Sequence, residues 1–259
     1  GKTVMSIVGT CLNLIQAADV GGRDGVDDSK EFEIIETEAG EFANVDMYSP
    51  EGIKHAKDKK IVIDKKVDAV TSPYPVLGAS VFDSKQKGRI FTLFRHPVER
   101  ANSYFHYISQ ADFDPNYSPY LAALTVEAYA KTPEDRPEFN WMTKSLTNKF
   151  DVSSEELTEE DLDKAKEFLR EKFLIGMLDN KGDSMLRFEM YFQWQYKEAD
   201  DKVCEEKLLH WTYNNQNSHP NIIPGSEAWA WLERRNQFDM DLYEYAKFLF
   251  VDQEKFFYN

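Results

Sequence analysis

The chain has 259 residues, of which 42% are hydrophobic, and this is enough apolar material to bury the core of one large domain. Its formal net charge of −15 excludes general nucleic-acid binding and a surface-wide grip on a polyanionic glycan, because both depend on an excess of Lys and Arg. An anionic ligand must therefore be held by a local cluster of Arg, Lys and backbone N–H groups. No apolar run reaches the roughly 18 residues that a membrane-spanning helix needs.

Hydrophobic periodicity predicts an α/β fold, with both helices and short strands in the first hundred residues. Apolar residues at helical spacing predict a helix over residues 3–18, and a polar, Gly-rich loop follows at residues 21–30. Short apolar runs predict strands, and Pro73 and Pro75 end one of them because proline lacks a backbone N–H. The predicted strands are residues 32–35, 61–63, 67–72 and 90–94, and a helix is predicted at residues 50–57.

The second half of the chain is predicted to be mainly helical. Thr158 and Asp161 form a variant capping box before an amphipathic run, and a buried strand is predicted over residues 173–178. No repeat, low-complexity tract or linker divides the sequence, so residues 1–259 are predicted to form a single domain. The remaining predicted helices are residues 183–192 and 236–250.

Two cysteines, Cys11 and Cys204, are too few for a disulfide framework or a zinc site. One bridge between them would fit a secretory compartment, but two buried thiols are the favoured interpretation. The sequence also contains no cluster of residues at the spacing of a metal site. We therefore expect no metal cofactor.

Residues 88–105 carry the clearest chemical signal. A buried strand delivers Arg95 at its carboxyl end, where open α/β sheets bind ligands, and Pro97 begins a helix beside it. Ser103 falls about two turns along that helix, so a guanidinium and a hydroxyl can converge on a phosphate. A structural alternative stays open, in which Arg95 makes a salt bridge at the strand end and Ser103 is a surface hydroxyl.

The pattern Arg95-x-Pro97-x-x-Arg100-x-x-Ser103 after a hydrophobic strand resembles the 3′-phosphate-binding motif of the sulfotransferases. These enzymes move sulfonate from 3′-phosphoadenosine 5′-phosphosulfate (PAPS) onto a hydroxyl or an amine. Three further segments resemble, in the same order, those of the membrane-associated carbohydrate sulfotransferases and their algal relatives. They are residues 140–146, residues 173–178 with Ser184 and Arg187, and residues 236–246. The resemblance covers nearly the whole chain and implies a P-loop-type parallel sheet flanked by helices.

The resemblance also extends to the first residues. Gly1, Lys2, Thr3 and Val4 are similar to the end of the loop that holds the 5′-phosphosulfate, which places the preceding strand and the motif lysine upstream of residue 1. Lys2 departs from the family, which has Gly or Thr at this position. Lys144 is expected near the acceptor or the donor phosphate, and an exposed helix lysine is the alternative.

The catalytic base is a second departure from the family. Relatives often carry a His just after the strand that corresponds to residues 67–72, whereas residues 72–78 contain neither a His nor a carboxylate. A histidine is well suited to accept a proton near neutral pH. His96, next to Arg95, is therefore the candidate base. The other histidines considered are His55 and His106.

The resemblance implies an enzyme that transfers sulfonate from PAPS to a carbohydrate hydroxyl and releases adenosine 3′,5′-bisphosphate (PAP), in a Golgi-type lumen. Two alternatives stay open. The missing base and altered loop also fit a sulfotransferase fold that is retained as a structural subunit and binds a protein partner. Gly1-Lys2-Thr3 also matches the tail of a Walker A loop, as in a P-loop kinase or NTPase, but no clear Walker B Asp follows an apolar strand.

Overall fold

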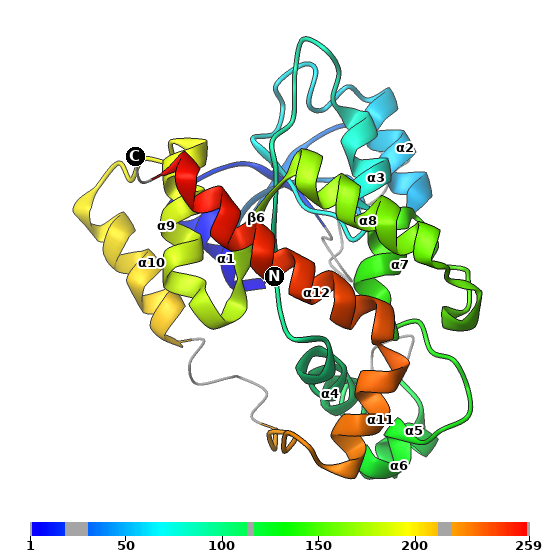
Figure 1. The fold of residues 1–259 in the computed structure, drawn as a ribbon. Coiled ribbons are helices and arrows are strands. Elements are labelled where there is room, and N and C mark those ends of the chain that lie inside the picture. Colours follow the sequence, from blue (N-terminus) through cyan, green and yellow to red (C-terminus); the bar gives the residue numbers. More distant parts are fainter. Residues whose placement is uncertain (1, 19–30, 113–116, 212–218, 258–259) are drawn as a thin grey trace. The chain divides into compact units, whose positions relative to one another are not determined.

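The structure is a computed structural model, and it describes residues 2–18, 31–112, 117–211 and 219–257 (Figure 1). Gly1 and the predicted loop at residues 21–30 lie outside the described residues. The chain is α/β and helix-rich, as the sequence predicts. It divides into a first unit, Gly1–Ile90 with Met185–Tyr213, and a second unit, Phe91–Ser184 with Asn214–Asn259. The single domain stays a prediction, and each unit is described by itself.

The first unit contains a four-stranded sheet in the order β2-β3-β1-β4. β1 (Gln16–Ala17) is parallel to both β3 (Gly40–Ala43) and β4 (Ala69–Val70), whereas β2 (Ile34–Thr37) is antiparallel to β3. The strand predicted at residues 32–35 is therefore present but shifted by two positions, and the strand predicted at residues 67–72 is present in shorter form. β3 is absent from the sequence prediction because it has only four residues and includes a glycine and a charged side chain.

The helix predicted over residues 3–18 is wrong beyond Cys11. α1 (Lys2–Ser6) leads into a π-helical segment, η1 (Ile7–Cys11), in which the N–H of Leu12 donates to the carbonyl oxygen of Ile7 at 3.0 Å. Asn13 then has a φ of 52°, the left-handed conformation in which helices commonly end. The residues that follow enter β1, although their apolar spacing is still that of a helix.

The helix predicted at residues 50–57 is confirmed as α2 (Pro50–Asp58), and the Ser49 side chain accepts a hydrogen bond from the N–H of Gly52. The strand predicted at residues 61–63 is wrong. Ile61 and Val62 are buried, but they lie in turns after α2 because Lys60 adopts a left-handed φ of 54°. These apolar residues fill the core of the first unit without joining the sheet. The other helices that end in this unit are α3 (Pro75–Gly78), α9 (Lys181–Phe192) and α10 (Ala199–Trp211).

Cys11 and Cys204 form a disulfide between η1 and α10, so the favoured prediction of two thiols is wrong. α10 packs against η1 and brings the two Cα atoms to 5.6 Å, within the range that a disulfide can span. The residues are 193 positions apart, and both belong to the first unit. Only the packing of a helix late in the chain onto its first segment brings them together.

The second unit contains a two-stranded sheet of β5 (Ile90–Phe94) and β6 (Phe173–Met177), and both strands were expected from their apolar runs. α8 begins at the predicted capping box of Thr158 and Asp161, and α12 packs against β6, α7 and α8 (Figure 1). Among the described residues, no helix has both the length and the apolar character of a membrane span. The helices of this unit are α4 (Pro97–Ile108), α5 (Pro119–Ala122), α6 (Val126–Ala130), α7 (Trp141–Thr147), α8 (Glu159–Lys172), α11 (Glu227–Arg235) and α12 (Gln237–Asp252).

Candidate functional site

Arg95 directly follows β5 and stands before the first turn of α4, where Pro97 occupies the first helical position. Its Nε lies 3.6 Å from Oε2 of Glu99, so the salt bridge that the sequence leaves open is present. This buried Nε has no hydrogen-bond partner among the described residues. Ser103 is half-buried one turn beyond Glu99, and residues four apart share a helix face. Arg95, Glu99 and Ser103 therefore lie along one side of the start of α4.

His96 is held between aromatic rings of the second unit. Its ring centroid lies 4.9 Å from that of Trp229 on α11 and 5.3 Å from that of Tyr243 on α12. The Nδ1 atom is buried and makes no hydrogen bond to any described residue. Burial lowers the pKa of His96 below its ordinary value, although nearby carboxylates oppose the shift. The imidazole is therefore neutral at neutral pH and can accept a proton.

Lys144 is not an exposed helix lysine, since only 1% of its side chain is exposed. Its Nζ lies 3.4 Å from Oδ2 of Asp135, which also accepts a hydrogen bond from the N–H of Ser154. Burial would raise the pKa of Asp135, but the bonds from Ser154 and Lys144 outweigh it and leave the pKa below its ordinary value. The ammonium of Lys144 is thus already paired within the second unit.

Two of the segments that resemble sulfotransferase motifs meet in a buried polar network. Asp239 of α12 accepts hydrogen bonds from the N–H groups of Met142 and Thr143 at the start of α7, and from the Thr143 hydroxyl. In return, the N–H of Asp239 donates to Oδ1 of Asn140, and the N–H of Asn140 donates to Oδ1 of Asn236. These side chains satisfy the free backbone groups at the starts of both helices. The two motifs therefore hold α7 and α12 together.

Arg100, the second arginine of the 3′-phosphate-like motif, belongs to the same interior. Its guanidinium donates to the backbone carbonyl of Glu138 and lies 5.4 Å from the ring of Trp141. Burial raises the pKa of Asp239, and the positive charge of Arg100 acts in the opposite direction. Arg100 thus has a structural role in the second unit, although its Nε, like that of Arg95, makes no hydrogen bond to any described residue.

The other two candidate bases lie elsewhere. His55 is half-buried on α2 in the first unit. His106 is on α4, where its ring stacks on that of His219 with centroids 4.9 Å apart and planes within 9° of each other. Burial lowers the pKa of His106, and the neighbouring His219 lowers it further. Neither histidine adjoins Arg95 in the sequence as His96 does.

The residues expected to contact the 5′ side of the donor belong to the first unit. Lys2 begins α1, Thr3 is half-buried, and the Val4 side chain is buried. Gly1 lies outside the described residues. Arg95 and Ser103 belong to the second unit, so the expected 5′ and 3′ contacts come from different units.

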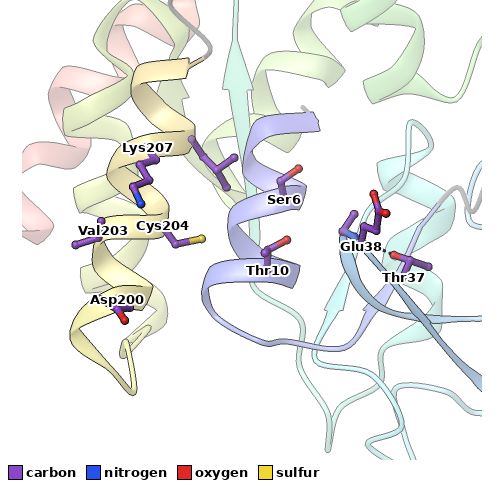
Figure 2. A pocket seen from close by; sticks show the side chains of 10 residues that line it. Ser6, Thr10, Thr37, Glu38, Asp200, Val203, Cys204 and Lys207 are labelled. Atoms are coloured by element: carbon purple, nitrogen blue, oxygen red, sulfur yellow. Dashed lines mark hydrogen bonds between the residues drawn. The ribbon is translucent and has the colours of Figure 1, made fainter.

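The first unit also carries a groove of about 1050 Å³ beside the disulfide. Figure 2 shows α10 on one side of the helix that bears Ser6 and Thr10, and the turn after β2 on the other. The groove is lined by one cationic side chain, Lys207, and by two carboxylates, those of Glu38 and Asp200. This charge balance does not suit a phosphate-rich ligand. The other lining residues are Thr37, Ala39, Val203, Cys204 and Leu208.

Sequence reasoning missed the residues that surround His96. Tyr243 is buried, and its hydroxyl donates to Oδ2 of Asp179 at 3.1 Å. Asp179 follows β6 by two residues, so the rule that ligands bind near strand ends could have drawn attention to it.

Among the described residues, no group of three or more His, Cys, Asp or Glu side chains is arranged to hold a metal ion.

No family model matches this sequence, and no curated protein or solved structure was found to be similar to it. The resemblance to the sulfotransferases therefore depends on the motifs quoted above.

Proposed function

We propose that the protein is a sulfotransferase that moves sulfonate from PAPS to a hydroxyl group, with a carbohydrate as the acceptor, on a P-loop-type fold. The observation that carries the proposal is the position of Arg95 at the end of β5, with Ser103 farther along the same side of α4. The Nε of Arg95 makes no hydrogen bond to any described residue and has Glu99 as its ion-pair partner. An arginine fork and a hydroxyl are suitable partners for the 3′-phosphate. The parallel pairing of β1 with β3 and β4 supports the P-loop-type part of the proposal.

The reaction needs positioning and charge stabilisation. The acceptor oxygen bonds to sulfur, the bond between sulfur and the bridging phosphate oxygen breaks, and PAP leaves with that electron pair. Negative charge spreads over the sulfonate oxygens and the leaving phosphate, and cations and N–H groups directed there lower the barrier. In the proposal, Arg95 and Ser103 bind the 3′-phosphate, and Gly1, Lys2, Thr3 and Val4 lie on the 5′ side. The proton of the acceptor goes to a base.

The disulfide supports the localisation that the resemblance implies. Disulfides persist mainly in oxidising compartments, and the secretory lumen is one of them. The bond between Cys11 and Cys204 therefore fits a protein of the Golgi or another part of the secretory route. A glycan acceptor would be available in the same compartment.

Binding of PAP, measured by calorimetry, tests the proposal. Arg95→Ala should weaken binding by roughly 10-fold to 150-fold, the equivalent of about 1.5–3 kcal/mol for a hydrogen bond to a charged group, and Arg95→Lys should restore little. Ser103→Ala should weaken it by roughly twofold to tenfold. Arg170→Ala is the matched control, because Arg170 is an exposed arginine paired with Glu167 on α8. Equal affinity in the Arg95→Ala variant and the control would remove Arg95 from the site.

The two alternatives give different results. A sulfotransferase fold kept as a structural subunit would bind PAP but transfer no radiolabelled sulfonate to a panel of sulfate-free glycans. A P-loop kinase or NTPase would bind Mg-ATP in preference to PAP. Transfer to a glycan that is lost with Arg95→Ala is the result that supports the proposed enzyme.

A further inference from the structure

Three elements of the second unit fix the imidazole of His96. The residue stands between β5 and α4, with φ −53° and ψ 127°, so its backbone has left the strand and has not entered the helix. Trp229 packs on the ring at an interplanar angle of 38°, and Tyr243 meets it edge-on at 68°. The hydroxyl of Tyr243 is in turn held by Asp179, just after β6. The orientation of His96 therefore depends on Asp179 through Tyr243.

The two ring nitrogens of His96 have different surroundings. Nδ1 is buried without a hydrogen-bond partner among the described residues, whereas Nε2 is not among the buried atoms that lack a partner. For Nε2 to accept a proton, the neutral ring must carry its hydrogen on Nδ1. The carboxylates of Glu99, Asp179 and Glu233 act on the imidazole from α4, the turn after β6 and α11. Lys247 acts on it from α12 with a positive charge. Burial outweighs the carboxylates, so the ring is neutral at neutral pH.

We propose that Asp179 and Tyr243 are positioning residues that hold His96 ready to accept the proton of the acceptor hydroxyl. The inference rests on the proposed function, since His96 adjoins Arg95 at the end of β5. As the acceptor oxygen bonds to sulfur and PAP leaves, the proton moves to Nε2 of His96 and the imidazole becomes an imidazolium. Asp179, Glu99 and Glu233 favour that cation. General base help of this kind is typically worth about 10²–10⁴-fold in rate.

The first test does not depend on activity. The titration of His96 can be followed by NMR in the full chain, with His96→Gln assigning its signal among the five histidines. Asp179→Asn keeps an oxygen for the Tyr243 hydroxyl but removes a negative charge, so the pKa of His96 should fall. Glu233 is exposed, and Glu233→Gln should lower the pKa of His96 without affecting Tyr243. Asp252 is exposed and pairs with Lys255, so Asp252→Asn is the control that should leave the pKa of His96 unchanged.

The second test uses the transfer reaction. The acid limb of the kcat profile should move to lower pH in Asp179→Asn, by the same interval as the pKa of His96. Tyr243→Phe should lower kcat by roughly twofold to tenfold, as expected for one lost hydrogen bond, and leave the affinity for PAP unchanged. His96→Gln should lower kcat by about 10²-fold or more. A purely structural role of Asp179 would not move the acid limb.

Three results would overturn the inference. An unchanged titration of His96 in Asp179→Asn would show that the carboxylate does not act on the imidazole. An acid limb that survives in His96→Gln would assign the base to another residue. PAP binding without transfer would remove the base role while leaving the donor site intact. Failure of PAP to bind would instead reject the proposed function, and the titration would still decide whether Asp179 acts on His96.

Discussion

Glu99 should limit the affinity of the proposed site for its donor, and replacing it with Gln should strengthen PAP binding. Oε2 of Glu99 lies 3.6 Å from Nε of Arg95, so the carboxylate occupies one side of the guanidinium that the 3′-phosphate needs. A phosphate bound to the same guanidinium would be repelled by that carboxylate. Glu99→Gln keeps the length of the side chain and removes only the charge.

The size of the gain follows from Coulomb's law. At a separation of about 5.5 Å, two like unit charges repel by about 0.8 kcal/mol in water and by about 3 kcal/mol at an effective dielectric constant of 20. The Glu99 side chain is 43% exposed, so the lower part of this range applies. We expect Glu99→Gln to tighten PAP binding by about 1–2 kcal/mol, or roughly fivefold to 30-fold. Added salt should reduce the gain.

Calorimetry with PAP at two salt concentrations would measure this effect. Glu167→Gln is the matched control, because it removes the same charge from an exposed carboxylate that pairs with Arg170 on α8. The double variant with Arg95→Ala should show no gain, since the phosphate would no longer lie beside Glu99. Unchanged or weaker PAP binding in Glu99→Gln, with Arg95 intact, would refute the reasoning that places the phosphate on this guanidinium.

Two predictions concern the stability of the fold. Replacing Cys11 and Cys204 with Ala should lower the free energy of unfolding by about 2–5 kcal/mol, because the disulfide closes a loop across 193 positions; a urea midpoint equal to that of the oxidised wild type would contradict this. Asp239→Ala should cost about 3–5 kcal/mol, because it removes three hydrogen bonds and a charge that acts on buried Arg100. Exposed Asp241→Ala on the same helix is its control, and equal thermal unfolding of the two variants would show that the network does not stabilise the protein.

Elements whose signals are local could be predicted from the sequence. α4 begins at Pro97 because proline presets the helical φ and needs no backbone partner in the first turn. α8 begins where Thr158 and Asp161 exchange hydrogen bonds, and these two residues are only three positions apart in the chain. β5 was predicted with its observed bounds from five consecutive apolar or β-branched residues. The position of Arg95 at a strand end followed directly from these elements.

Features that depend on distant residues could not be predicted in this way. Apolar spacing continues past Cys11, but partner strands β3 and β4 decide that Gln16 and Ala17 extend instead of coiling. The sequence equally contains no sign that α10 would bring Cys204 to Cys11, or that Asp135 would pair with buried Lys144.

The proposed base shows the same division most clearly. The sequence alone identified His96 as a histidine beside Arg95 at the end of a strand. Only the tertiary structure decided that Trp229 and Tyr243 pack on its ring and that Asp179 holds Tyr243. The pKa and orientation of an imidazole depend on its burial and on nearby charges. Glu99 is close in the sequence, but Asp179, Trp229 and Tyr243 come from segments more than 80 positions away along the chain.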